Sequence, residues 1–308
     1  VFCMMVTSQA YIAEMAPCES RGMWQGRVAA IGFCAVPVVA LVCRMVIPMS
    51  EEAWRWIFYA GGLGIIPFVL GLKYLKESPR WLVAHGRIRE AEEVVTYLTG
   101  KDIDLSEAAK SVQPKIAVTD VLIGMFTRKY IGRTLLLMLL FICITPAGFL
   151  LTTWTTQLLK MLGFSVKESL TAMTIISIGV PVGCFLNSLV SDMGGRKMPL
   201  AILGVLAAVT ALIFGGMKGL VMLTLLGFTV TVFNMALNFT LFSYTAESYP
   251  TRMRNTATGF HNGLARLSVS ASQPLIPMIH ASFGFAGIFT SVAFLFFLPV
   301  IPLLIWGA

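Results

Sequence analysis

The stretch YTAESYPTRMR, residues 244–254, has a counterpart near the start of the chain, YIAEMAPCESRG, residues 11–22. In both copies a Glu is followed three residues later by Pro and seven residues later by Arg. These pairs are Glu14 with Arg21 and Glu247 with Arg254, and each Glu lies at the end of an apolar segment. A pattern that returns 233 residues later indicates an internal repeat, so the chain derives from two related halves.

The composition outside these motifs is that of a membrane protein. The 308 residues are 57% hydrophobic and 12% charged, whereas an ordinary soluble domain has about 25% charged residues. A bilayer core about 30 Å thick requires roughly 20 apolar residues per helix. The apolar runs predict an all-α polytopic membrane protein, and we expect the last long run to break near residues 282–287. The nine candidate spans are 1–14, 27–48, 54–75, 132–159, 168–190, 198–217, 219–243, 257–280 and 285–306.

Several function classes are disfavoured by what the chain does not contain. The six cysteines include no CxxC pair, which argues against a disulfide framework or a zinc site. HExxH, GxSxG and Walker patterns are absent, so we expect no enzyme, no cofactor and no bound metal. The net charge is +8, but the basic residues are scattered at the ends of apolar runs. They therefore do not indicate a nucleic-acid surface.

The distribution of basic residues gives the orientation. If the first span descends into the cytoplasm and later spans alternate, seventeen of the 23 Lys and Arg residues fall on the cytoplasmic side. This asymmetry follows the positive-inside rule. We expect the plasma (inner) membrane, with the central loop in the cytoplasm.

The central loop divides the chain. Within it, residues 88–98 place Ile88, Ala91, Val94, Val95 and Leu98 on one helical face, which predicts a short amphipathic helix. We therefore expect three parts: the remainder of an N-terminal transmembrane half at 1–75, a cytoplasmic loop at 76–131, and a C-terminal half of six helices at 132–308.

Two further motifs complete a recognisable set. ESPRWL, residues 77–82, follows the third span, and DMGGRK, residues 192–197, joins the fifth and sixth spans. With the two repeated motifs, in this order, the chain resembles the major facilitator superfamily, in its branch of sugar porters and of organic-ion and aromatic-acid proton symporters. The resemblance implies a major facilitator fold that lacks its first three helices, with family helices four to twelve present. It also implies secondary transport by alternating access.

The charged motif residues form the first set of candidate site residues. In the family such residues form charge networks that close the inner gate and break when the cavity opens inward. The alternative is that the basic residues only anchor helix ends at the lipid headgroups. The residues assigned to this network are Glu14, Arg21, Glu77, Arg80, Asp192, Arg196, Glu247 and Arg254.

Polar residues inside the spans form the second set, because solutes in such folds bind near the midplane between the two halves. We expect Trp154, Gln157, Asn234 and Asn238 to contact the substrate. The alternative is hydrogen bonding to neighbouring helices or to the residue's own backbone. Other polar residues in the spans are Asn187, His261, Asn262 and Gln273.

The sequence of the seventh family helix limits the classes of substrate that the resemblance implies. Sugar porters have paired glutamines and an asparagine there, whereas this chain has CITPAGF at residues 143–149, with Pro146 and Gly148 expected to bend the helix. The resemblance therefore favours a small organic or aromatic acid carried with protons. The alternatives are a sugar or polyol porter and, from another class, a non-transporting membrane sensor. The expected partners are the substrate, the lipid bilayer and a coupling proton, with no nucleic acid, and we expect a monomer.

Overall fold

The structure is a computed structural model that describes residues 11–12, 15, 21–50, 52–106, 117–190 and 196–307. All regular secondary structure in these ranges is helical. The chain forms two compact units: residues 1–28 with 54–115, and residues 29–53 with 116–308. The predicted division into three parts at 75 and 131 stays a prediction.

The larger unit is a helical bundle. Its helices are α3 (Ala35–Val46), η1 (Ile47–Met49), α9 (Val118–Met125), α10 (Ile131–Thr153), α11 (Thr155–Met161), α12 (Val166–Val190), α13 (Lys197–Gly216), α14 (Leu220–Ser248), α15 (Thr251–Ser272), α16 (Leu275–Phe297) and α17 (Val300–Trp306). The smaller unit contains α4 (Trp54–Gly62), α5 (Ile65–Tyr74), α6 (Pro79–Ala84) and α7 (Ile88–Thr99), and α2 (Arg21–Phe33) crosses the boundary between the two units.

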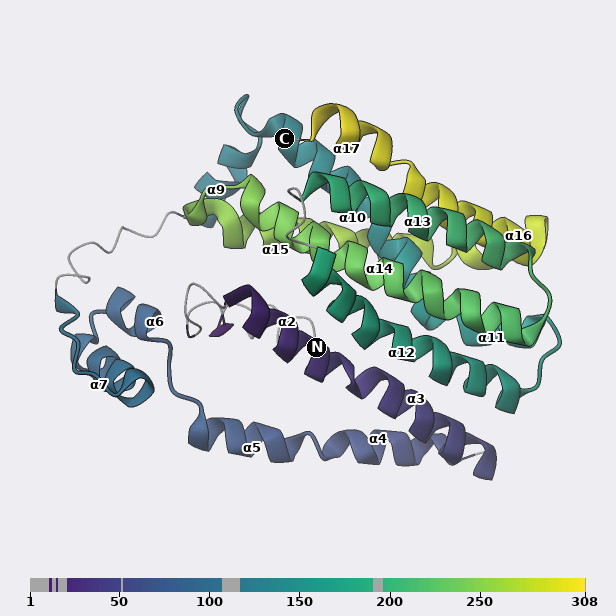
Figure 1. The fold of residues 1–308 in the computed structure, drawn as a ribbon, viewed down its shortest axis with the longest axis horizontal. Coiled ribbons are helices and arrows are strands. Elements are labelled where there is room, and N and C mark those ends of the chain that lie inside the picture. Colours follow the sequence, from purple (N-terminus) through teal and green to yellow (C-terminus); the bar gives the residue numbers. More distant parts are fainter. Residues whose placement is uncertain are drawn as a thin grey trace. The chain divides into compact units, whose positions relative to one another are not determined.

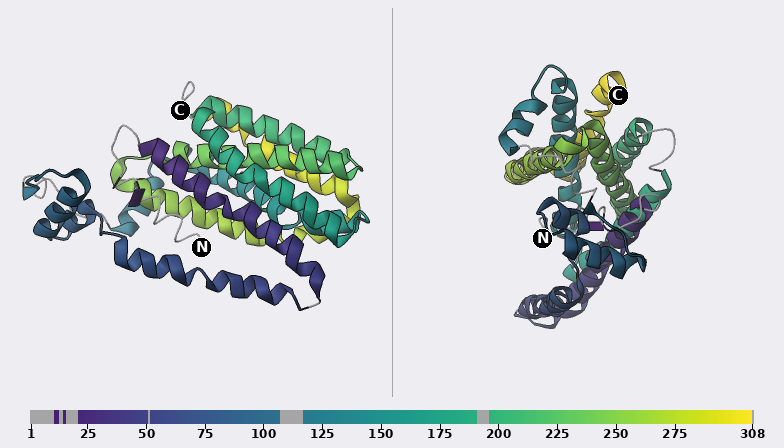
Figure 2. Two further views of the ribbon diagram at one scale, coloured as in Figure 1. Left: turned by 60° about the horizontal axis from the view of Figure 1, so that its bottom comes forward. Right: turned by 90° about the vertical axis from the view of Figure 1, so that its left-hand side faces the viewer.

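Helix α14 lies at the centre of the larger unit. It packs against α12 on one side and α13 on the other, and it also contacts α10 and α15 (Figures 1 and 2). Leu223, Val230, Ala236, Leu237 and Leu241 of α14 are buried in one continuous apolar core. Helix α3 packs on the far side of α12. The residues at the end of α14 are therefore positioned by all of its neighbours.

Two glycines allow α12 to approach α14 closely. A Cβ at Gly183 would lie 2.5 Å from the Val232 carbonyl oxygen, and a Cβ at Gly179 would lie 2.8 Å from that of Phe228. Association of helices in lipid depends on close packing, because lipid tails are as apolar as the side chains that they replace. Larger residues at these positions would force the two helices apart.

The predicted spans agree with the helices. The described residues contain seven helical stretches that are long and apolar enough to cross a membrane. Of the nine predicted spans, the one at 1–14 lies almost wholly outside the described residues. The span at 257–280 corresponds to α15 and the start of α16, and α15 is too polar to be one of the seven. The predicted break at 282–287 is confirmed at Gly284, whose φ of 65° interrupts α16 and suits glycine.

The central loop contains the predicted amphipathic helix. Helix α7 covers residues 88–99 and buries Ala91 and Val94 against Leu82 of α6. Helix α6 begins with a capped first turn, in which Ser78 accepts a hydrogen bond from the Trp81 amide and Pro79 is the first residue. These two helices form a small apolar core of their own.

The contact at Gly183 gives a stability prediction with a definite sign. Alanine normally stabilises a helix by up to about 1 kcal/mol relative to glycine. Gly183→Ala should nevertheless lower the apparent melting temperature in detergent, by an amount equivalent to about 1–3 kcal/mol, because its Cβ meets the α14 backbone. Gly259→Ala in α15, which has no atom within 4 Å of the new Cβ, is the matched control and should be neutral or stabilising. Melting of Gly183→Ala at or above the wild-type temperature would contradict the close contact.

Candidate functional site

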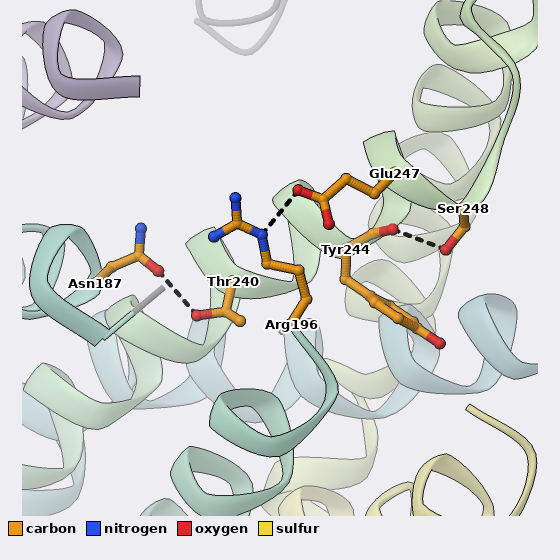
Figure 3. A network of polar contacts seen from close by, with 6 residues as sticks. All are labelled: Asn187, Arg196, Thr240, Tyr244, Glu247 and Ser248. Atoms are coloured by element: carbon orange, nitrogen blue, oxygen red, sulfur yellow. Dashed lines mark hydrogen bonds and ion pairs between the residues drawn. The ribbon is translucent and has the colours of Figure 1, made fainter. Parts of the chain in front are cut away.

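An ion pair joins the start of α13 to the end of α14. The Arg196 Nε donates to Glu247 Oε1 at 2.8 Å, and the two side chains are 21% and 54% exposed (Figure 3). Arg196 precedes the first turn of α13 and Glu247 lies in the last turn of α14. The helix dipole disfavours a cation at an N-terminus and an anion at a C-terminus. The attraction between the two charges therefore offsets the unfavourable interaction of each charge with the dipole of its own helix.

The neighbouring cation, Lys197, has a different partner. Its Nζ donates to the carbonyl oxygen of Gly307 at 2.8 Å, immediately after α17 ends at Trp306. A cation is favourable at the C-terminus of a helix. The two adjacent basic residues of the DMGGRK motif thus connect the start of α13 to two different helices, α14 and α17.

A polar contact lies close to the ion pair, between α12 and α14. The Thr240 hydroxyl lies 2.8 Å from Asn187 Oδ1 and 2.8 Å from the Ala236 carbonyl oxygen. About two turns further along α14, the Ser248 hydroxyl donates to the Tyr244 carbonyl oxygen at 2.7 Å (Figure 3). The end of α14 therefore contacts both α12 and the start of α13 through polar groups.

The structure brings together two of the eight predicted network residues, Arg196 and Glu247. Glu14 and Asp192 lie outside the described residues, as do the side chains of Arg21 and Arg80. Glu77 is exposed between α5 and α6. Arg254 is partly buried in the first turn of α15, and its Nε has no hydrogen-bond partner among the described residues. The larger network stays a prediction.

The two predicted asparagines form a pair inside the bundle. Asn238 Nδ2 donates to the Asn234 carbonyl oxygen at 2.8 Å and to Asn234 Oδ1 at 3.0 Å. Asn234 is 1% exposed, and its own Nδ2 has no hydrogen-bond partner among the described residues. A buried donor without a partner costs about 1–3 kcal/mol. Such a group is a candidate for binding a ligand acceptor.

Gly148 is the residue that allows this asparagine to lie against α10. A Cβ at Gly148 would lie 2.5 Å from Asn234 Oδ1 and 2.6 Å from its Nδ2. Pro146 is buried in the same helix, α10, which runs from Ile131 to Thr153 and ends before Trp154. The CITPAGF segment thus provides space for an amide of α14 and has no amide side chain of its own.

Trp154 is paired across the bundle. Its Nε1 donates to Gln273 Oε1 at 2.7 Å, and Gln273 Nε2 donates to the Val269 carbonyl oxygen at 3.3 Å. Trp154 lies between α10 and α11, and Gln273 lies between α15 and α16. Gln157 is exposed on α11. Substrate contact by Trp154 and Gln157 stays a prediction. The sequence alone could not predict the hydrogen bond from Trp154 to Gln273, because the two residues are 119 positions apart.

The contact between Gly148 and Asn234 can be tested by paired substitutions. Gly148→Ala should lower the apparent melting temperature, by about 1–3 kcal/mol in equivalent stability, because the methyl group displaces the Asn234 amide. In an Asn234→Ala background the same change should cost less than about 0.5 kcal/mol, since the obstructing amide is absent. Gly132→Ala, in the same helix with no atom within 4 Å, is the control. Equal costs of Gly148→Ala in both backgrounds would show that the two residues do not touch.

The comparisons with known proteins agree with this fold. Residues 2–305 match the family model described as "Sugar (and other) transporter". The putative metabolite transport protein YyaJ of Bacillus subtilis is 29% identical over 92% of this chain and 64% of its own length. The niacin transporter NiaP of Acinetobacter baylyi is 27% identical over 90% of this chain and 63% of its own length. The chain thus spans less than two thirds of these two relatives.

A solved structure shows the same architecture. The partially occluded, inward-open xylose transporter XylE from E. coli superposes with a TM-score of 0.71 at 18% identity, over 98% of this chain and 67% of that one. At this identity the likeness concerns the fold. The family match, which covers nearly the whole chain, shows more: the chain belongs to the family described as "Sugar (and other) transporter", a family of multi-pass membrane transporters and not of enzymes.

Proposed function

We propose that the full-length protein is a secondary transporter that carries a small organic or aromatic acid together with protons by alternating access. The observation that carries this proposal is the exposed ion pair between Arg196 and Glu247, which joins the ends of α13 and α14. The proposed role of this pair is a latch, a contact that holds the cytoplasmic helix ends together while the inner gate is closed.

The geometry of the pair suits a latch. An exposed ion pair stabilises a protein by only about 0–1 kcal/mol, so it can break without a large cost. Both charges also lie at helix ends where the helix dipole disfavours them. Pairing relieves this unfavourable interaction, which favours re-formation of the ion pair when the helices close. A deeply buried pair would cost several kcal/mol to separate and would resist repeated opening.

The substrate class is proposed from the interior of the bundle. The unpartnered Asn234 amide is a hydrogen-bond donor, which fits a carboxylate or carbonyl oxygen of a solute. The seventh family helix has no glutamine in the segment 143–149. Among the relatives, NiaP is named for niacin, itself a small aromatic acid. These observations favour an organic acid.

A sugar or polyol is the second candidate. The family model is described as covering sugars as well as other solutes. The amides of Asn234 and Asn238 can donate to and accept from hydroxyl groups, so they do not exclude a polyol. From the distribution of basic residues we propose that the central loop lies in the cytoplasm. We also propose that the protein is a monomer in the plasma (inner) membrane.

Uptake into proteoliposomes tests both the substrate class and proton coupling. With the full-length protein and an inward proton gradient of one pH unit, radiolabelled niacin should accumulate up to about tenfold if one proton accompanies each molecule. A protonophore should abolish the accumulation, and xylose should not compete. Uptake indifferent to the gradient would contradict proton coupling, competition by xylose would favour the sugar porter, and saturable binding without flux would favour a sensor.

Charge exchange tests the latch. Arg196→Glu and Glu247→Arg should each lower the uptake of whichever solute is transported by at least about tenfold, because like charges then repel each other where the ion pair joined α13 to α14. The double exchange restores opposite charges and should recover much of the uptake. Lys160→Glu on the opposite side of the membrane is the charge-matched control and should transport normally. A double variant no better than either single variant would contradict a direct pair.

A further inference from the structure

The short helix α9, which precedes α10, is fixed firmly to the bundle. Val121 and Met125 are 2% and 0% exposed and face the core. A Cβ at Gly124 would lie 3.1 Å from the Met253 methyl group, so α9 lies close against the first turn of α15. Helix α9 is therefore an integral part of the larger unit.

A buried polar network holds the end of α9. The Thr134 hydroxyl donates to the Met125 carbonyl oxygen at 2.8 Å and lies 2.8 Å from the Tyr249 hydroxyl. His261 Nδ1 lies 2.7 Å from the Ala257 carbonyl oxygen, and its Nε2 lies 3.4 Å from that of Thr134. Burial raises the pKa of Tyr249, so its hydroxyl stays neutral. The network therefore adds no negative tyrosinate that could neutralise the basic residues near it.

The outer side of α9 is apolar where a soluble protein would be polar. Ile123 is 69% exposed and Phe126 is 44% exposed. Together with Leu122, Thr127 and Phe260 of α15, these residues line an open groove of about 530 Å³, which we call the α9 groove. The rings of Phe126 and Phe260 meet edge to face, with centroids 6.0 Å apart. An exposed apolar surface on a short helix beside a membrane span is typical of a helix at the lipid interface.

Three cations follow the α9 groove directly. Arg128, Lys129 and Arg133 are exposed within six consecutive positions, where the span Ile131–Thr153 begins. No described carboxylate forms an ion pair with any of the three, and Lys129 Nζ lies 5.4 Å from the centre of the Tyr130 ring. The groove is therefore an apolar surface with unneutralised positive charge at its membrane boundary.

We propose that the α9 groove binds an anionic phospholipid. One acyl chain lies along Ile123, Phe126 and Phe260, and the phosphate lies between Arg128, Lys129 and Arg133. A soluble anion would use the cations and leave the apolar residues uncovered. An anionic lipid uses both, at the depth where the span meets the headgroups. Each cation near a charged membrane surface strengthens binding by about fivefold, which is about 1 kcal/mol.

Lipid titration of the delipidated full-length protein in neutral detergent tests this proposal and does not depend on transport. Phosphatidylglycerol should raise the melting temperature at lower concentration than phosphatidylcholine with the same acyl chains, and native mass spectrometry should show it retained. In the Arg128→Gln, Lys129→Gln, Arg133→Gln triple variant, this preference should fall by at least about tenfold. The matched control removes three exposed cations at the opposite ends of the helices, Lys160→Gln, Lys167→Gln and Lys218→Gln, and should keep the preference.

The apolar half of the site has its own variant. Ile123→Asn with Phe126→Asn leaves every charge in place and should weaken phosphatidylglycerol binding severalfold, and glycerol phosphate should stabilise no variant. The proposal is overturned if the triple variant keeps the wild-type preference, if the control loses it equally, or if glycerol phosphate stabilises the protein as well as the lipid does. None of these results bears on which solute the protein transports.

Discussion

The close contact of α14 with its neighbours is the constraint on which the rest of this structure depends. In a bilayer the hydrophobic effect does not drive helices together, so close packing and interhelical hydrogen bonds must do so. Gly183 brings α12 against the Val232 backbone, and Gly148 brings α10 against the Asn234 amide. Both contacts fix α14, which carries the asparagine pair in its middle and Glu247 at its end. The candidate binding residues and the candidate latch are therefore positioned by the same helix.

Electrostatics at the helix ends complement this packing. Arg196 and Lys197 both lie at the start of α13, where the helix dipole disfavours a cation, and each donates to an oxygen at the C-terminal end of another helix. The partners differ in kind. Glu247 is an exposed carboxylate, whereas the Gly307 carbonyl belongs to the backbone next to α17. Separation of α13 from α14 would break the first contact and need not disturb the second.

Much of the architecture was predictable from the sequence, because hydrophobic periodicity and backbone chemistry are local. The break at Gly284 and the helix over residues 88–98 follow from glycine and from helical spacing. The partners of individual side chains were not predictable. The sequence assigned Arg196, Glu247 and Arg254 to one charge network but not which of them pair, and in the structure Glu247 pairs with Arg196. Which helix ends meet in space depends on packing between distant segments, as does the Trp154–Gln273 contact.

The hydrogen bonds within the spans separate ordinary polar residues from unusual ones. The hydroxyls of Thr210, Thr224, Thr231 and Thr245 each donate to the carbonyl oxygen four residues earlier, so they need no other partner. Asparagine has two amide hydrogens and cannot be satisfied in this way alone. Asn238 uses its amide on Asn234, which leaves the Asn234 amide buried without a partner among the described residues. The buried Ser169 hydroxyl also has no partner among the described residues, but it lies in the first turn of α12, at the end of a span and not in its middle. The proposed solute would accept a hydrogen bond from this Asn234 amide, which lies in the middle of α14.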